Sequence, residues 1–317
     1  MLVCGQTLGE TLGSAARRYH STMRGKVLLG RRTGLSVGLA ALAIAWLPAA
    51  AAPPPATWLV TLLDGEAVVV DGLKRIAAAS GIELGPGALI ETTETTALLR
   101  LEGADQSSID LGPGTRVMLS PPAQASRGGR VPALYLLQGW AKLTSRGSAP
   151  VAGFVTPGLE GGNFQGAVVL RVARSEQSVF AETARIELAE RRTGGTPQRL
   201  APGEFYRGDG SKPGNKPGSL APRPEATWLK ELPRAFRDTI ALRAASFKGR
   251  PVTITTLPGP SYEQLAHWLA AEPYARRDFP QRFAPLLRDA AFRRDVQQRL
   301  STHPEWASLL YPKETPR

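Results

Sequence analysis

The sequence predicts a mainly β protein, a sandwich or a solenoid-like stack of strands, followed by a small C-terminal α-helical region. Two observations support this prediction. Apolar residues in the region 57–207 alternate with period two, in segments of about five to eight residues bounded by Gly, Pro, Asp or Ser. In the region 225–317 they instead recur at three- and four-residue spacing, which is typical of helices.

The N-terminal region has the layout of an export signal. Basic residues precede the uncharged run "TGLSVGLAALAIAWL", and small residues with an Ala-x-Ala cleavage site near Ala50–Ala52 follow it. We therefore interpret residues 1–52 as an N-terminal extension with a signal peptide, and Met23 as the true start. Cleavage implies a periplasmic protein. If residues 33–52 stay uncleaved, they are long enough to associate with the inner membrane as a single span, with the following domain in the periplasm.

The charge is strongly basic, and part of it belongs to the export signal. The chain has a net charge of +12, and residues 1–52 hold six of its 39 basic and one of its 27 acidic residues. The remaining charge of +7 favours acidic surfaces such as phospholipid or an anionic polymer. Nucleic acid is not expected as a partner of an exported chain. The single cysteine, Cys4, precedes Met23, so the mature chain has neither a disulfide nor a thiolate metal site.

The predicted strands follow one another along the first half of the chain. In "TWLVTLLD", Trp58, Val60 and Leu62 share one face, and "ALLRL" places Leu99 and Leu101 together with Arg100 opposite. The pattern continues in "TRVMLS", "ALYLLQGWAKL", "GAVVLRVAR" and "ARIELAER". No segment of this region has a helical apolar stripe, so we predict an all-β domain at 57–207.

The motif "LGPG" occurs twice, at Leu84–Gly87 and Leu111–Gly114. A phosphate-binding loop needs successive backbone N–H groups, and the proline removes one of them. Pro followed by Gly is typical of a type II turn, in which Gly supplies the positive φ. We therefore predict turns, and the recurrence suggests two strand-turn units built by the same rule.

The character of the chain changes after the β region. Residues 208–224, "GDGSKPGNKPGSLAPRP", are rich in Gly and Pro and are predicted to be a linker. Beyond them, Phe236, Ile240 and Ala244 recur at four-residue spacing and predict a helix, and "PVTITTLP" is predicted to be extended.

Two further helices are predicted in the tail. Ser261 is an N-cap candidate for "SYEQLAHWLAAEP", and in "DAAFRRDVQQRL" the side chains of Phe292, Val296 and Leu300 share one face. A helical unit of this size buries too little surface by itself, so we expect it to pack on the β region or on a partner.

The order of the β segments resembles the FecR domain, over roughly Val60 to Arg207. The matching pieces are Gly65–Val70, Gly87–Leu101, Ser107–Leu111, Leu136–Gly139, Thr156-Pro157 with the strand from Gly166, and Leu200–Gly203. The resemblance implies a β fold, a periplasmic location and binding to other envelope components. Well-studied relatives relay the state of an outer-membrane receptor to a cytoplasmic sigma factor through an N-terminal anti-sigma segment. Here the apolar run starts at Thr33, too early for that module, and the region after the domain looks helical instead of receptor-docking α/β.

The sequence contains no recognisable catalytic constellation. G-x-S-x-G, H-E-x-x-H and P-loop strings do not occur. His267 and His303 lack a second ligand at metal spacing and are expected to be packed or exposed. Asp105 and Asp110 are interpreted as turn formers at strand ends. We therefore expect no enzyme activity, no catalytic residue, no cofactor and no metal.

Exposed aromatic residues and one polar loop are the candidates for an interaction surface. Tyr135, Trp140 and Phe154 lie on or beside strands, and Glu160 and Asn163 occupy the Gly-rich loop "LEGGNFQG". Trp and Tyr bury much area at low entropy cost, which favours them in binding patches. They are equally favoured in a core.

The tail has three tryptophans of the same double character, Trp228, Trp268 and Trp306, which are expected to hold the tail onto the sheet. Two functions follow. The first is a non-enzymatic periplasmic protein that binds an envelope protein or cell-wall polymer through its β surface, in a scaffold or accessory role. The alternative is a membrane-anchored signal-transduction regulator of the FecR anti-sigma type.

Overall fold

The computed structural model describes residues 57–121, 131–148, 150–174, 176–191, 196–209 and 218–312. Cys4, Met23, the predicted signal peptide and residues 210–217 of the predicted linker lie outside the described residues. Within the described ranges, no helix combines the length and the apolar character that a membrane span requires.

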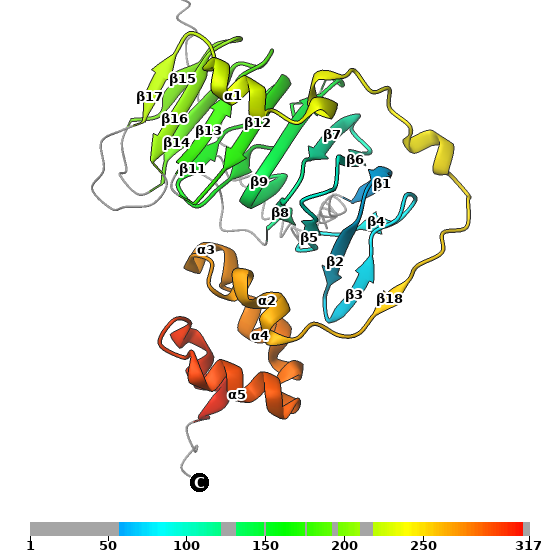
Figure 1. Ribbon diagram of the computed structural model, residues 1–317, viewed down its shortest axis with the longest axis vertical. Coiled ribbons are helices and arrows are strands. Elements are labelled where there is room, and N and C mark those ends of the chain that lie inside the picture. Colours follow the sequence, from blue (N-terminus) through cyan, green and yellow to red (C-terminus); the bar gives the residue numbers. More distant parts are fainter. Residues whose placement is uncertain are drawn as a thin grey trace, which may run out of the picture. The chain divides into compact units, whose positions relative to one another are not determined.

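The fold is mainly antiparallel β, with short helices towards the C-terminus (Figure 1). In the described part, 18 strands hydrogen-bond in one continuous sheet. The sheet folds into two layers at β9 (Leu134–Ser145), whose first half pairs with β8 and β10 and whose second half pairs with β7 and β12. The bend falls at Gly139, which has a φ of +95°. A Cβ there would lie 2.5 Å from the Cα of Thr115, so only glycine fits the bend.

In each layer the strands lie nearly in chain order. Layer A contains, in spatial order, β4 (Glu83–Leu84), β1 (Trp58–Asp64), β6 (Leu98–Gly103), β7 (Ser107–Leu111), the second half of β9, β12 (Gly166–Val172), β13 (Glu176–Phe180), β16 (Phe205–Asp209) and β17 (Ser219–Ala221). Layer B contains β18 (Thr256–Leu257), β3 (Lys74–Ala77), β2 (Ala67–Asp71), β5 (Leu89–Thr92), β8 (Arg116–Leu119), the first half of β9, β10 (Phe154–Val155), β11 (Leu159–Gly161), β14 (Ile186–Glu190) and β15 (Gln198–Leu200).

Both "LGPG" motifs are turns, as predicted. Each leads the chain from a strand of layer A to a strand of layer B, from β4 to β5 and from β7 to β8. The glycine in the third turn position has a φ of +79° at Gly87 and +59° at Gly114. The two units therefore follow the same rule of construction.

The main core lies between the layers. Layer A contributes Val60, Leu99 and Ile109, and layer B contributes Val69 and Ile90, all fully buried in one apolar cluster. Each such side chain stabilises the fold by roughly 1.5–3 kcal/mol. The period-two pattern thus points alternate side chains of each strand toward the core, and it places Arg100 on the outer face of layer A.

A segment that we name the strap, residues 226–247, crosses the outer face of layer A. It contains α1 (Ala226–Glu231), η1 (Arg234–Arg237) and η2 (Ala244–Phe247), and from there the chain continues to β18 (Figure 1). Trp228 is its main apolar contact. The ring packs against Phe205 and Trp140, with centroids 5.1 and 5.2 Å away, and its Nε1 donates to the Ser178 hydroxyl at 2.8 Å.

The prediction of a helix through Phe236, Ile240 and Ala244 is wrong. The chain forms two short 3-10 turns with an irregular stretch between them. The reason is that the sheet satisfies the backbone groups that a helix would use: the Phe236 carbonyl accepts from Lys142, and the Ala244 N–H donates to Glu102.

The linker prediction needs a similar correction, because Ser219–Ala221 forms β17 and pairs with β16. Of the extended segment "PVTITTLP", Thr256–Leu257 forms β18 at the edge of layer B.

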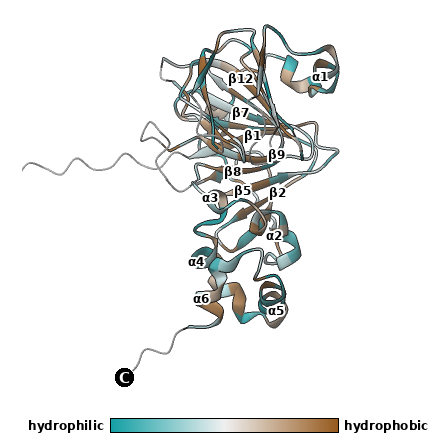
Figure 2. Ribbon diagram, turned by 90° about the vertical axis from the view of Figure 1, so that its left-hand side faces the viewer, coloured by the Kyte–Doolittle hydropathy of each residue, from teal (hydrophilic) through white to brown (hydrophobic). Residues whose placement is uncertain are grey.

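The tail packs on the outer face of layer B, as expected, and Figure 2 shows its helices below β2, β5 and β8. Its elements are α2 (Tyr262–Leu269), α3 (Pro273–Arg276), α4 (Phe279–Phe283), η3 (Ala284–Arg288), α5 (Ala290–Gln298), η4 (Pro304–Trp306) and α6 (Ala307–Leu310). Ser261 is the N-cap of α2 in a full capping box with Gln264, which confirms that prediction. Phe292 and Val296 face the second apolar cluster together with Trp268.

Candidate functional site

The aromatic candidates lie in the interior of the protein. Phe154 belongs to the core between the layers, and Tyr135 lies under the tail with its ring centroid 5.9 Å from that of Tyr274. Trp140 is covered by Trp228 of the strap. These side chains hold layers, strap and tail together and offer no exposed patch, because the C-terminal region covers both outer faces. The three tail tryptophans are buried as well, as the packing alternative predicts.

The polar candidates lie at the β11 turn. Asn163 is exposed, and its Oδ1 accepts the Gly153 N–H at 3.1 Å, which is a turn-stabilising contact. Glu160 is half-buried on β11. Glu160 and Asn163 are three residues apart in the chain. None of the three aromatic candidates reaches the surface beside them, because all three are buried. An interaction surface at this turn stays a prediction.

The two histidines fulfil the expectation of packing or exposure. His303 is fully buried between the rings of Tyr262 and Trp306, and its Nδ1 lies 2.9 Å from the Thr302 hydroxyl. His267 is exposed on α2. Within the described residues, no group of three or more His, Cys, Asp or Glu side chains is placed to hold a metal ion.

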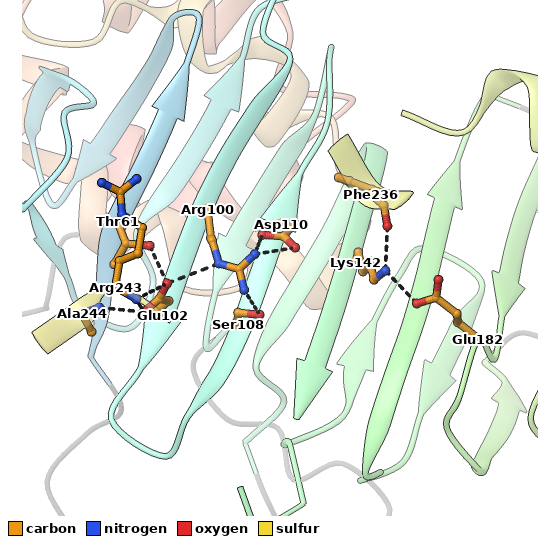
Figure 3. A network of polar contacts seen from close by, with 10 residues as sticks. All are labelled: Thr61, Arg100, Glu102, Ser108, Asp110, Lys142, Glu182, Phe236, Arg243 and Ala244. Atoms are coloured by element: carbon orange, nitrogen blue, oxygen red, sulfur yellow. Dashed lines mark hydrogen bonds and ion pairs between the residues drawn. The ribbon is translucent and has the colours of Figure 1, made fainter. Parts of the chain in front are cut away.

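Of the two acidic residues predicted to form turns, the prediction is correct for Asp105 and wrong for Asp110. Asp105 accepts the Ser107 N–H at 3.0 Å and forms a turn. Asp110 lies inside β7 and is only 4% exposed, so the turn interpretation is wrong for it. The carboxylate belongs to a polar network on the outer face of layer A, shown in Figure 3, which is the candidate site.

Two rows of polar residues cross β6, β7 and β9 and form this network. The antiparallel register places Arg100, Asp110 and Lys142 side by side in the first row. The second row contains Glu102, Ser108 and Thr144 in the same order. Because successive residues of a strand alternate between faces, all six point away from the core. The first row thus alternates cation, anion and cation.

Arg100 connects the two rows, and its side chain is almost completely buried. Its Nη1 lies 3.2 Å from the Asp110 Oδ1, its Nε donates to Glu102 at 3.3 Å, and its Nη2 donates to the Ser108 hydroxyl at 3.1 Å (Figure 3). One guanidinium therefore compensates two buried carboxylates, as its planar fork of donors allows.

Glu102 fixes the second end of the strap. Its carboxylate accepts the Arg243 N–H and the Ala244 N–H, each at 2.8 Å, and the Thr61 hydroxyl at 2.9 Å. These two N–H groups open the η2 turn and have no partner within it. A buried carboxylate of layer A and the free donors of the strap thus satisfy each other.

Lys142 fixes the middle of the strap in a similar way. Its Nζ donates to the Phe236 carbonyl at 2.7 Å and lies 2.7 Å from the Glu182 carboxylate. The strap is therefore held at Trp228, at Phe236 and at the start of η2, by one apolar and two charged contacts.

A cavity of about 210 Å³ lies between the charged contacts. It is lined by Arg100, Asp110, Lys142, Thr144, Arg146, Ala167, Glu182, Asp238 and Thr239. Burial raises the pKa of Asp110 to about 6, against the opposing effect of Arg100 and Lys142. The Asp110 Oδ1 has its ion pair with Arg100 but no hydrogen bond within the described residues. The cavity can therefore offer a ligand both positive and negative groups.

Sequence reasoning missed this site, although a signal exists. The outer-face positions of "LLRLEG" and "SSIDL" hold Arg100, Glu102, Ser108 and Asp110, which include charges of both signs. Opposite charges at facing positions of two adjacent strands can form cross-strand pairs, which predicts that these residues interact on one face of the sheet.

No family model and no curated protein matches this chain. Among solved structures it is similar to two crystal structures, at 2.50 Å and 1.65 Å resolution, of a "putative anti-sigma factor" from Parabacteroides distasonis ATCC 8503. The sequence identity is 15% and the TM-score 0.32, and the match covers 43% of this chain. The chain matches 59% of that protein's length. At this TM-score the likeness carries no argument about function.

Proposed function

We propose that this protein is an exported, non-enzymatic binding protein of the FecR-domain type, which attaches to an acidic component of the cell envelope. The compartment follows from the predicted signal peptide, and the family from the ordered β segments at 57–207. The observation that supports an acidic partner is the charge of the strap and the residues that follow it.

The segment 226–250 is strongly basic. It carries two acidic residues, Glu231 and Asp238, against six exposed basic residues, namely Lys230, Arg234, Arg237, Arg243, Lys248 and Arg250. A run of like charge on a fixed backbone concentrates a polyanion at the surface. The contacts of the strap with Ser178, Glu102 and Lys142 of layer A fix that backbone. The geometry thus supports a scaffold that presents a positive band.

The binding test uses purified peptidoglycan as the polyanion. The triple variant Arg234→Gln, Lys248→Gln and Arg250→Gln removes three exposed charges, none of which has a hydrogen bond or ion pair within the described residues. A matched control changes Arg199, Arg288 and Arg293 to Gln, all exposed outside the strap. We expect the full chain to co-sediment at low salt, with a loss of about tenfold or more in the triple variant only. Equal binding by the two variants would contradict the proposal.

The alternative is a membrane-anchored regulator of the FecR anti-sigma type. It rests on the same resemblance and requires that residues 33–52 stay attached as a membrane span. The basic strap favours the binding protein, because a relay to the cytosol needs no positive band in the periplasm.

A further inference from the structure

The cavity under the strap contains binding groups that the protein itself leaves partly unused. Arg146 lines the mouth of the cavity, is exposed, and makes no hydrogen bond or ion pair within the described residues. Lys142 uses its ammonium group on two acceptors and retains capacity for a third. Both groups could hold an anion.

The deep part of the cavity has the opposite preference. Asp110 is 96% buried there, and its Oδ1 accepts no hydrogen bond within the described residues. Buried carboxylate oxygens normally accept hydrogen bonds, and one that lines a cavity can take them from a ligand. A ligand N–H or ammonium group would complete its coordination.

A ligand of one charge alone fits this cavity poorly. A simple anion would meet the carboxylates of Asp110, Glu182 and Asp238, whereas a simple cation would meet Arg100, Lys142 and Arg146. The volume of about 210 Å³ is larger than a single water needs and suits a small molecule of a few heavy atoms. A molecule that carries both charges on a short backbone can match both sides.

We propose that the cavity between layer A and the strap binds a small zwitterion of amino-acid size, with its carboxylate on Arg146 and Lys142 and its ammonium group on Asp110. The site is independent of the proposed attachment to an acidic polymer, which uses the outward face of the strap. Because Asp238 and Thr239 of the strap form one wall, a bound ligand also connects the strap to layer A.

The test is a binding screen with the full chain at pH 7.5. The probes are the twenty common amino acids, followed by calorimetry of the best one against the matching half-probes, propionate and ethylamine. We expect one saturable site for an amino acid and at least about tenfold weaker binding of each half-probe. Failure of every amino acid, or half-probes that bind equally well, would overturn the assignment.

Two substitutions test the residues. Arg146→Met should lower the affinity by about tenfold or more without changing the fold, because its side chain is exposed. Arg199→Met removes another exposed arginine, on β15, and should leave the affinity unchanged. Unchanged binding in Arg146→Met contradicts the proposed pose. These results do not depend on peptidoglycan binding, so the two proposals fail separately.

Discussion

Asp110 of β7 lies directly opposite Arg100 of β6 in the antiparallel register, and the carboxylate is 3.2 Å from the guanidinium group. Both side chains are on the outer face of layer A, yet the strap covers them and leaves Arg100 only 1% exposed. Breaking one partner of such a pair leaves a buried charge without compensation. The network therefore couples the stability of the sheet to the attachment of the strap.

Glu102→Gln tests that coupling. The variant keeps the shape of the side chain but removes the charge that Arg100 and the η2 N–H groups contact. We expect a loss of about 3–5 kcal/mol in the free energy of unfolding, measured in urea, and faster hydrogen exchange at Arg243 and Ala244. Glu187→Gln is the control. Glu187 belongs to an exposed pair with Arg199, so that change should stay within about 1 kcal/mol. Equal effects of the two substitutions would show that the network does not hold the strap.

Asp110→Asn tests the pH dependence of the same network. The pKa of Asp110 is raised from 3.8 to about 6 in the folded protein. Its protonated form therefore favours folding, and this contribution is complete below pH 3.8 and is lost as the pH rises through 6. Between pH 4 and pH 8 the wild type should lose about 2.5 kcal/mol relative to Asp110→Asn, in urea unfolding measured at each pH. Parallel stability curves for the two proteins would refute the raised pKa.

Trp228→Ala tests the apolar contact of the strap. The ring fills the space between Trp140 and Phe205, so its removal should cost about 3–5 kcal/mol and open the strap to limited proteolysis. The neighbouring Leu229 is 39% exposed, and Leu229→Ala should change stability by about 0.5 kcal/mol or less. A strap that resists protease equally in both variants would speak against this contact.

Gly139→Ala tests the bend of β9 between the layers. The substitution combines a positive φ with a Cβ only 2.5 Å from Thr115, so the chain must shift. We expect a loss of stability well above about 1 kcal/mol, seen as a lower thermal midpoint. Gly259→Ala is the control, because that glycine has no positive φ and nothing within 4 Å of the added Cβ. Similar midpoints for the two variants would mean that β9 does not need glycine at the bend.

Local patterns were sufficient to predict the β layers, the two "LGPG" turns and the cap at Ser261. Each of these depends on neighbouring residues, such as alternating apolar side chains or a proline before a glycine. The strap is different. Its apolar spacing resembles that of a helix, but backbone groups at Phe236, Arg243 and Ala244 hydrogen-bond instead to Lys142 and Glu102, 94 and 141 or more residues away in the chain.

The candidate site was missed for the same physical reason. The strand pattern correctly places Arg100 away from the core, but it contains no information about a later segment that covers that face. The burial of Trp140 by Trp228 depends on the same long-range contact. Aromatic residues that look like an exposed patch in the sequence are therefore internal in the fold.

The most direct test of the central claim isolates the protein from fractionated cells and identifies its N-terminal residue by mass spectrometry. The proposed binding protein should appear in the periplasmic fraction with a chain that begins near Ala52. A chain found intact in the cytosol, or one in the membrane fraction that retains residues 33–52, would contradict it.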